Sequence, residues 1–145
     1  MKVIKITPPI LRAVQKVISA ALEYESLTGR KPGITGEVGE VLVCKKLRLQ
    51  LAADPLVAGY DAVDKNGKKY QIKTRRAVRW ERRYLGRIGI FARHEFDYAI
   101  LAILDKNYKP RELYQISHKR ITPILNRYPR RNPPIRVFVR NAKKV

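Results

Sequence analysis

The feature that most constrains the fold is a predicted β-hairpin at residues 59–74, which carries polar side chains on a strand of the core. Two runs of alternating apolar residues flank Asn66-Gly67, which is the strongest short-range hairpin signal. In the second run, the polar Gln71 and Lys73 alternate with apolar side chains. Packing of a core strand does not require these polar side chains, so another role must account for them.

The length of the turn decides which side chains share a face with Gln71. In a two-residue turn, Ala62 would pair with Gln71, and Asp61 would lie on the opposite face. In a three-residue turn, Asp61 itself pairs with Gln71, and Lys73 lies on the same face because side chains alternate along a strand. The longer turn therefore gathers an acid, an amide and an ammonium on one surface.

The residues of the turn favour the longer form. Asp64 is a preferred first residue of a type I turn, and Lys65 and Asn66 suit its two central positions. Gly67 can adopt the left-handed conformation that a G1 bulge requires. We therefore predict a three-residue turn in which Asp64 is the turn former and lies on the face opposite Asp61.

Asp61 followed by Gln71-Ile72-Lys73 resembles the D…(D/E/Q)xK signature of the PD-(D/E)xK nuclease superfamily, which includes archaeal Holliday junction resolvases. Such enzymes usually carry a glutamate on the helix before the hairpin, and Glu40 stands there. The resemblance covers roughly residues 35–75 by motif. It implies a restriction-endonuclease-like α/β fold, a mixed β-sheet flanked by helices, and a divalent-metal-dependent DNA endonuclease, which could be selective for branched DNA.

The resemblance also implies a role for each matched residue. Asp61 would bind Mg²⁺ directly and Glu40 directly or through water, while the Gln71 amide and the Ile72 carbonyl would be further ligands; Mn²⁺ would substitute. Lys73 would orient and help deprotonate the attacking water. Gln71 replaces the commoner carboxylate, which leaves two formal negative charges at the site. Weaker metal affinity follows, and loss of activity is the alternative outcome.

Each motif residue also has a purely structural explanation. Alone, Glu40 fits a solvated glutamate on an amphipathic helix, although its small neighbours Gly36 and Cys44 would let a strand or a metal approach. Asp61 and Lys73 alone would form a surface ion pair worth at most about 1 kcal/mol. The three residues together favour a catalytic site, because a protein that only binds DNA does not need this set.

The charge of the chain indicates a polyanionic partner, and DNA is the expected one. The 145 residues carry 32 basic and 12 acidic side chains, a formal net charge of +20. Residues 1–64 hold nine basic and seven acidic groups, whereas residues 65–145 hold 23 and five. Arginines interleaved with aromatic residues suit phosphate binding and base stacking. The predicted DNA-binding residues are Arg75, Arg76, Arg79, Trp80, Arg82, Arg83, Tyr84 and Arg87.

Several other classes of protein fit the sequence less well. A catalytically inactive DNA-binding module, or a nuclease subunit that requires a partner, is the main alternative. An RNA-binding protein is disfavoured because no RNP or KH motif occurs. No stretch approaches the roughly 20 apolar residues of a membrane-spanning helix. The single Cys44 excludes an internal disulfide, a zinc site is not expected from Cys44, His94 and His118, and the lack of a signal-peptide pattern predicts a cytoplasmic protein.

The length predicts one domain spanning residues 1–145, with an amino-terminal helical extension at 1–34 and a core at 35–145. A homodimer and the cutting subunit of a larger assembly are both compatible with such a small basic domain. The apolar periodicity predicts helices over residues 8–28, 35–51 and part of 117–128 on one side of Pro123. Strands are predicted at residues 56–64, 96–104, 112–116 and 135–140, and at 2–6 unless that segment is an arm.

Overall fold

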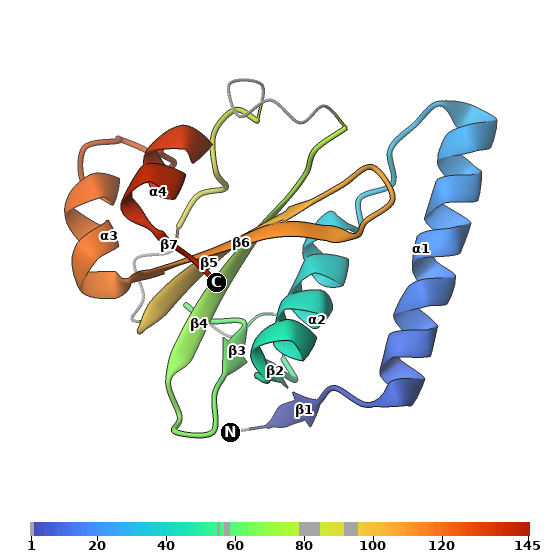
Figure 1. Ribbon diagram of the computed structural model, residues 1–145, viewed down its shortest axis with the longest axis horizontal. Coiled ribbons are helices and arrows are strands. Elements are labelled where there is room, and N and C mark those ends of the chain that lie inside the picture. The colour runs from blue at the N-terminus through green and yellow to red at the C-terminus, as the bar shows by residue number, and fades with distance from the viewer. Residues whose placement is uncertain (1, 55, 57–58, 79–84, 92–95) are drawn as a thin grey trace.

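A mixed β-sheet lies between two layers of helices and forms the centre of the protein (Figure 1). The computed structural model describes residues 2–54, 56, 59–78, 85–91 and 96–145. Within these residues the strands are β1 (Val3–Lys5), β2 (Gln50–Ala52), β3 (Ala62–Val63), β4 (Lys69–Arg76), β5 (Tyr98–Leu104), β6 (Pro110–Ser117) and β7 (Lys143–Lys144). The helices of the same part of the chain are α1 (Pro8–Thr28), α2 (Thr35–Leu47), α3 (His118–Leu125) and α4 (Ile135–Asn141). The predicted α/β class is thus confirmed.

The strands follow one another across the sheet in sequence order, and β4 occupies the middle. Every neighbouring pair is antiparallel except β4 and β5, which run parallel from Tyr70 opposite Tyr98 to Arg76 opposite Leu104. A parallel pair needs a crossover connection, and residues 77–97 supply it. The predicted apolar strand at 96–104 is confirmed as β5, whose residues 99–104 are almost completely buried.

The two faces of the sheet are covered by different parts of the chain. Helices α1 and α2 lie on one side, and α3 and α4 on the other (Figure 1). Ile100 and Ala102 of β5 pack in the core on the α2 side, while Leu101 and Ile103 pack with α3, α4 and the described part of the crossover. Burial of both faces explains why β5 is a continuous apolar run.

Helix α2 approaches β4 very closely at one glycine. A Cβ atom built on Gly39 would lie 2.0 Å from Oγ1 and 2.7 Å from Cβ of Thr74, well inside van der Waals contact. Only glycine therefore fits at this position of α2. The contact brings the next residue of the helix, Glu40, to the side of the central strand.

The amino-terminal segment is joined to the rest of the domain in two ways. Strand β1 pairs with β2, which settles the choice between a strand and an arm at residues 2–6. Helix α1 ends as predicted at Gly29 (φ 70°), and its Ile18 and Ala21 pack with Val38 of α2 and Leu104 of β5. No helix in the described part of the chain is long and apolar enough to cross a membrane.

Two predicted elements are shorter than the sequence pattern indicated. Helix α2 ends at Leu47 rather than near Leu51, because Arg48 adopts a left-handed conformation (φ 56°) and the chain turns into β2. Thr35 is the first helical residue, and Ile34 occupies the cap position. Strand β3 consists of only Ala62 and Val63 out of the strand predicted at 56–64. Residues 57 and 58 of that segment lie outside the described part of the chain.

The proline in α3 contradicts our prediction that it would confine the helix to one side. Pro123 is the sixth residue of an eight-residue helix, so its missing N–H removes only the bond to the Lys119 carbonyl. The hydroxyl of Thr122 donates to the carbonyl of His118 at 2.7 Å, and the side chain of Ser117 caps the first turn. These local hydrogen bonds stabilise the short helix although it contains Pro123.

The strand predicted at 135–140 is also wrong, since the segment forms α4. Ile135 and Phe138 are buried three residues apart, and Arg136 and Arg140 are exposed four residues apart. These spacings match one face of a helix as well as they match the alternation of a strand. The predicted strand at 112–116 is confirmed within β6.

Candidate active site

The hairpin between β3 and β4 has the three-residue turn that the sequence predicts. The N–H of Gly67 donates to the carbonyl of Asp64 at 3.0 Å, and Gly67 is left-handed (φ 79°). One carboxylate oxygen of Asp64 accepts the N–H groups of Asn66 and Lys68 at 2.8 and 3.0 Å. Asp64 is therefore a turn former, as predicted.

This turn fixes a register in which Asp61 follows the last pair of the hairpin. That pair is Ala62 with Tyr70, and continuing the same register would bring Asp61 towards Gln71. The N–H of Asp61 donates to the carbonyl of Tyr70 at 2.8 Å, so the two chains are still side by side there. Asp61 is thus placed at the end of the ladder between β3 and β4.

The carboxylate of Asp61 takes the place of a backbone acceptor at this point. The N–H of Ile72 donates to Oδ2 of Asp61 at 2.7 Å. A carboxylate that accepts from a strand N–H lies near the plane of the sheet, where it can be reached from both faces. The carbonyl of Ile72 points to the same side of β4 as its N–H, so it also faces Asp61.

Glu40 approaches this carboxylate from the α2 face of the sheet. Burial and the negative charges of Asp61 and Glu37 together raise the pKa of Glu40 to about 8, against the opposing effect of Lys73. Burial also raises the pKa of Asp61, while the hydrogen bond from Ile72 and the charge of Lys73 lower it. The charge of Asp61 therefore acts on the protonation of Glu40, and Glu37 raises the pKa of both carboxyl groups.

Lys73 approaches from the opposite face, where residues 85–91 cover β4. Its ammonium donates to the carbonyl of Ile90 at 2.8 Å and lies 5.3 Å from the centre of the Phe91 ring. Burial lowers the pKa of Lys73, whereas Asp61 and Glu40 raise it. A lysine in this setting is closer to losing a proton at neutral pH than a lysine in water.

Gln71 is the fourth motif residue, and it is buried in the core. It is 6% exposed, and its Oε1 has no hydrogen-bond partner among the residues that the structure describes. A buried acceptor without a donor costs about 1–3 kcal/mol, so a cation or another donor at this oxygen would be favourable. The structure thus leaves an amide oxygen free where the motif resemblance implies a ligand.

The oxygen atoms around Asp61 are of the kind that Mg²⁺ prefers. Among the described residues, no group of three or more His, Cys, Asp and Glu side chains is placed to hold a metal ion. A metal at this place would have only two carboxylates, those of Glu40 and Asp61. The remaining protein ligands would be the amide of Gln71 and the carbonyl of Ile72.

The predicted DNA-binding residues fall into three groups. Arg79, Trp80, Arg82, Arg83 and Tyr84 lie outside the described residues. Arg75 donates to the carbonyl of Arg87, and the exposed Arg87 donates to the carbonyl of Asn132 at 3.1 Å. Arg75 stands two residues after Lys73 on the same face of β4, whereas Arg87 lies on the segment that covers this face, with its guanidinium 5.4 Å from the centre of the Tyr128 ring.

Arg76 differs from Arg75 and Arg87 because its guanidinium is buried and paired with a carboxylate inside the protein. It makes two hydrogen bonds to the carboxylate of Glu25 in α1, at 2.6 and 3.2 Å, and it donates to the carbonyl of Lys106. It also lies 4.4 Å from the centre of the Tyr108 ring, and its side chain is 7% exposed. These contacts connect α1 to the central strand, and we leave Arg76 out of the proposed DNA-binding set.

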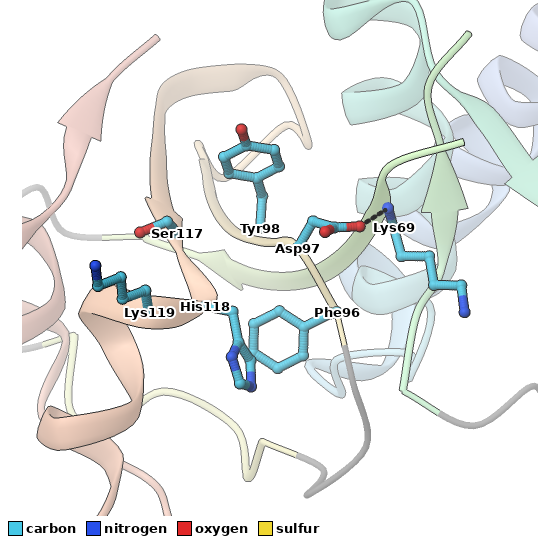
Figure 2. Close-up of a pocket in the computed structure, with 7 residues that line it drawn as sticks. All are labelled: Lys69, Phe96, Asp97, Tyr98, Ser117, His118 and Lys119. Atoms are coloured by element: carbon cyan, nitrogen blue, oxygen red, sulfur yellow. Dashed lines mark hydrogen bonds between the residues drawn. The ribbon is translucent and has the colours of Figure 1, made fainter. Parts of the chain in front are cut away.

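The structure also has a cavity of about 450 Å³ that contains none of the motif residues. Figure 2 shows Phe96 and His118 side by side in it, with ring centres 4.8 Å apart, and Asp97 bonded to the backbone of Lys69. Lys69 stands two residues before Gln71 on the same face of β4, a spacing that sequence reasoning could have noticed. The side chains around this cavity do not converge on a common point, so we assign it no chemistry.

The sequence matches no protein-family model and no curated protein. The residues and their geometry therefore carry the functional argument.

Proposed function

We propose that the protein is a divalent-metal-dependent DNA endonuclease of the PD-(D/E)xK type, with a restriction-endonuclease-like fold. The observation that carries the proposal is the meeting of three residues that are distant in sequence. Asp61 accepts from the backbone N–H of Ile72 in the sheet plane. Its charge raises the pKa of Glu40 on one face, and Lys73 lowers the pKa of Asp61 from the other. Packing of a binding module does not require such a set.

Each residue has a role that follows from its position. Asp61 and Glu40 would hold the metal, helped by the Ile72 carbonyl and the free amide oxygen of Gln71. A bound Mg²⁺ or Mn²⁺ would supply a nucleophilic hydroxide near neutral pH and neutralise charge on the phosphate. Lys73, with its lowered pKa, would orient the attacking water and take part in removing its proton.

The distribution of charge supports DNA as the substrate. The net charge of +20 is concentrated after residue 64, which is where β4 and the crossover begin. Arg75, two residues after Lys73 on β4, and the exposed Arg87 would contact phosphates near the scissile one. Both arginines would thus contact DNA next to the reacting groups.

The experiment is cleavage of labelled single-stranded, duplex, flap and four-way-junction DNA with Mg²⁺ or Mn²⁺. We expect Lys73→Met and Asp61→Asn to reduce cleavage about 100-fold or more while DNA affinity changes little. Asp61→Asn is preferred because its amide oxygen can still accept from Ile72. The matched control is Lys65→Met, which removes one lysine from the exposed turn of the same hairpin and should leave cleavage unchanged.

The main alternative is a DNA-binding module without activity, and Gln71 in place of a carboxylate is the observation that favours it. In that case the protein would bind all four DNA structures tightly and yield no metal-dependent product on any of them. A Gln71→Glu variant would then test whether a third negative charge restores cleavage. Tight binding with no product from either form would refute the proposed enzyme.

A further inference from the structure

Helix α1 has two apolar faces, and only one of them packs against the part of the chain that the structure describes. The inner face carries Ile18 and Ala21, which are buried with Val38 and Leu104. In Figure 1, α1 stands at the outer edge of the helical layer, with α2 between it and the sheet. The outer face therefore turns away from the domain.

The outer face carries apolar side chains at a regular spacing. Val17, Tyr24 and Leu27 are 46%, 43% and 78% exposed. The apolar positions alternate in steps of three and four residues over three heptads, which is the a/d pattern of a helix that packs against another helix. The six positions, of which the first is half-buried and the other five are exposed, are Ile10, Ala13, Val17, Ala20, Tyr24 and Leu27.

We propose that α1 pairs with α1 of a second copy of the chain in an antiparallel arrangement. Antiparallel pairing about the centre of the stripe places Ile10 against Leu27 of the second copy, and Ala13 against Tyr24 of that copy. The central layer places Val17 against Ala20. Each alanine then faces a large side chain, so the layers have the small-with-large complementarity that lets helices pack closely.

The charged residues beside the stripe match the antiparallel arrangement. Lys16 and Glu23 are exposed and stand immediately before Val17 and Tyr24, on one edge of the stripe. Antiparallel pairing places Lys16 of each copy beside Glu23 of the other, which gives two symmetric ion pairs. Parallel pairing would place these same two residues beside Ala21 and Thr28, which carry no charge.

Neither of these two charges is paired with an opposite charge within α1. Positions three and four residues before and after Lys16 and Glu23 carry no opposite charge, so neither residue has a partner of the usual intrahelical kind. The interface is small, with six apolar residues on each copy, and we expect a dimer that dissociates in the micromolar range. This inference does not depend on the proposed nuclease activity.

Charge reversal with rescue tests the pairing in the full-length protein without DNA. Sedimentation equilibrium should show a dimer that Lys16→Glu and Glu23→Lys each weaken about tenfold, because each change turns two attractive pairs into repulsive ones. The double variant should regain dimerisation to within about threefold of the wild type. Val17→Glu should abolish it, and unchanged thermal midpoints would show that these exposed substitutions leave the fold intact.

A distance measurement tests the direction of the helices. In the antiparallel dimer, two spin labels on Ser26→Cys would be offset by fifteen residues along the helix axis, or about 22 Å. In a parallel dimer the labels would lie at the same level, and only the distance between the helix axes, about 10 Å, would separate their helices. Cys44 is 1% exposed and would remain unlabelled. A protein that stays monomeric at hundreds of micromolar, a double variant without rescue, or the short distance would each overturn the proposal.

Discussion

Replacing Gly39 by alanine tests how closely α2 must approach the central strand. The added Cβ would lie 2.0 Å from Oγ1, 2.5 Å from Cγ2 and 2.7 Å from Cβ of Thr74. Rotation of the Thr74 side chain exchanges Oγ1 and Cγ2 but cannot move its Cβ. Helix and strand must therefore separate, by about 1 Å if a contact near 3.5 Å is to be restored.

The expected cost follows from two opposing effects. Overpacking a tight contact destabilises a protein by about 1–3 kcal/mol, and this clash with a backbone-attached atom belongs at the upper end. Alanine favours the helix over glycine by about 1 kcal/mol. We expect Gly39→Ala to lower the free energy of unfolding by about 2 kcal/mol, which corresponds to a fall in thermal midpoint of about 4–8 °C.

The same helix provides a matched control. A Cβ on Gly36 would meet nothing within 4 Å, so Gly36→Ala should raise the free energy of unfolding by up to about 1 kcal/mol. Thermal and urea unfolding of both variants would measure the difference. A second variant, Gly39→Ala with Thr74→Ala, should recover part of the loss, since the Cβ contact of 2.7 Å remains. If Gly39→Ala is as stable as Gly36→Ala, the close approach of α2 to β4 is refuted.

Two further predictions concern charged groups. Glu40 has a pKa raised to about 8 in the folded protein, so without a divalent metal the folded state loses stability as pH rises from about 4.5 to 8. Solvent screens this partly exposed site, so we expect the free energy of unfolding of the wild type to fall by about 2 kcal/mol across that pH range. Glu40→Gln should remove this fall, as measured by urea unfolding at each pH. An equal dependence on pH in the wild type and the variant would contradict this. For the arginines, Arg76→Gln should lower the thermal midpoint and leave the salt dependence of DNA binding unchanged, whereas Arg75→Gln should reduce its slope by about one ion. Equal slopes for the two variants would contradict the separation of their roles.

Local chemistry made the hairpin predictable from sequence. The turn from Asp64 to Gly67 is fixed by side-chain to backbone bonds and one left-handed glycine, all within four residues. Because the turn fixes the register, the pairing of Ala62 with Tyr70 followed as well, and it leaves Asp61 at the end of the ladder. The apolar run of β5 was equally readable, since a strand covered on both faces leaves a continuous signal.

Other features depend on contacts between distant parts of the chain and left no local signal. Arg76 meets Glu25 across 51 positions of sequence, so its structural use could not be separated from DNA binding. The alternation at residues 135–140 fits a strand, and its helix is selected by the buried positions of Ile135 and Phe138. The burial of Gln71, which is 6% exposed, likewise depends on a distant segment, because its strand β4 pairs with β5 from later in the chain.

The shortness of β3 explains why a site can form at the centre of the sheet. A longer β3 would continue the ladder with β4, and a backbone carbonyl would accept from the N–H of Ile72. Regular pairing stops at Ala62 instead, and the carboxylate of Asp61 accepts from that N–H at 2.7 Å. The end of the ladder thus leaves an acidic group between the two faces, where Glu40 and Lys73 both reach it. Extending the regular ladder by two residues, as far as Tyr60 opposite Ile72, would pair Ile72 through the backbone and remove the reason for Asp61 to lie in the plane of the sheet.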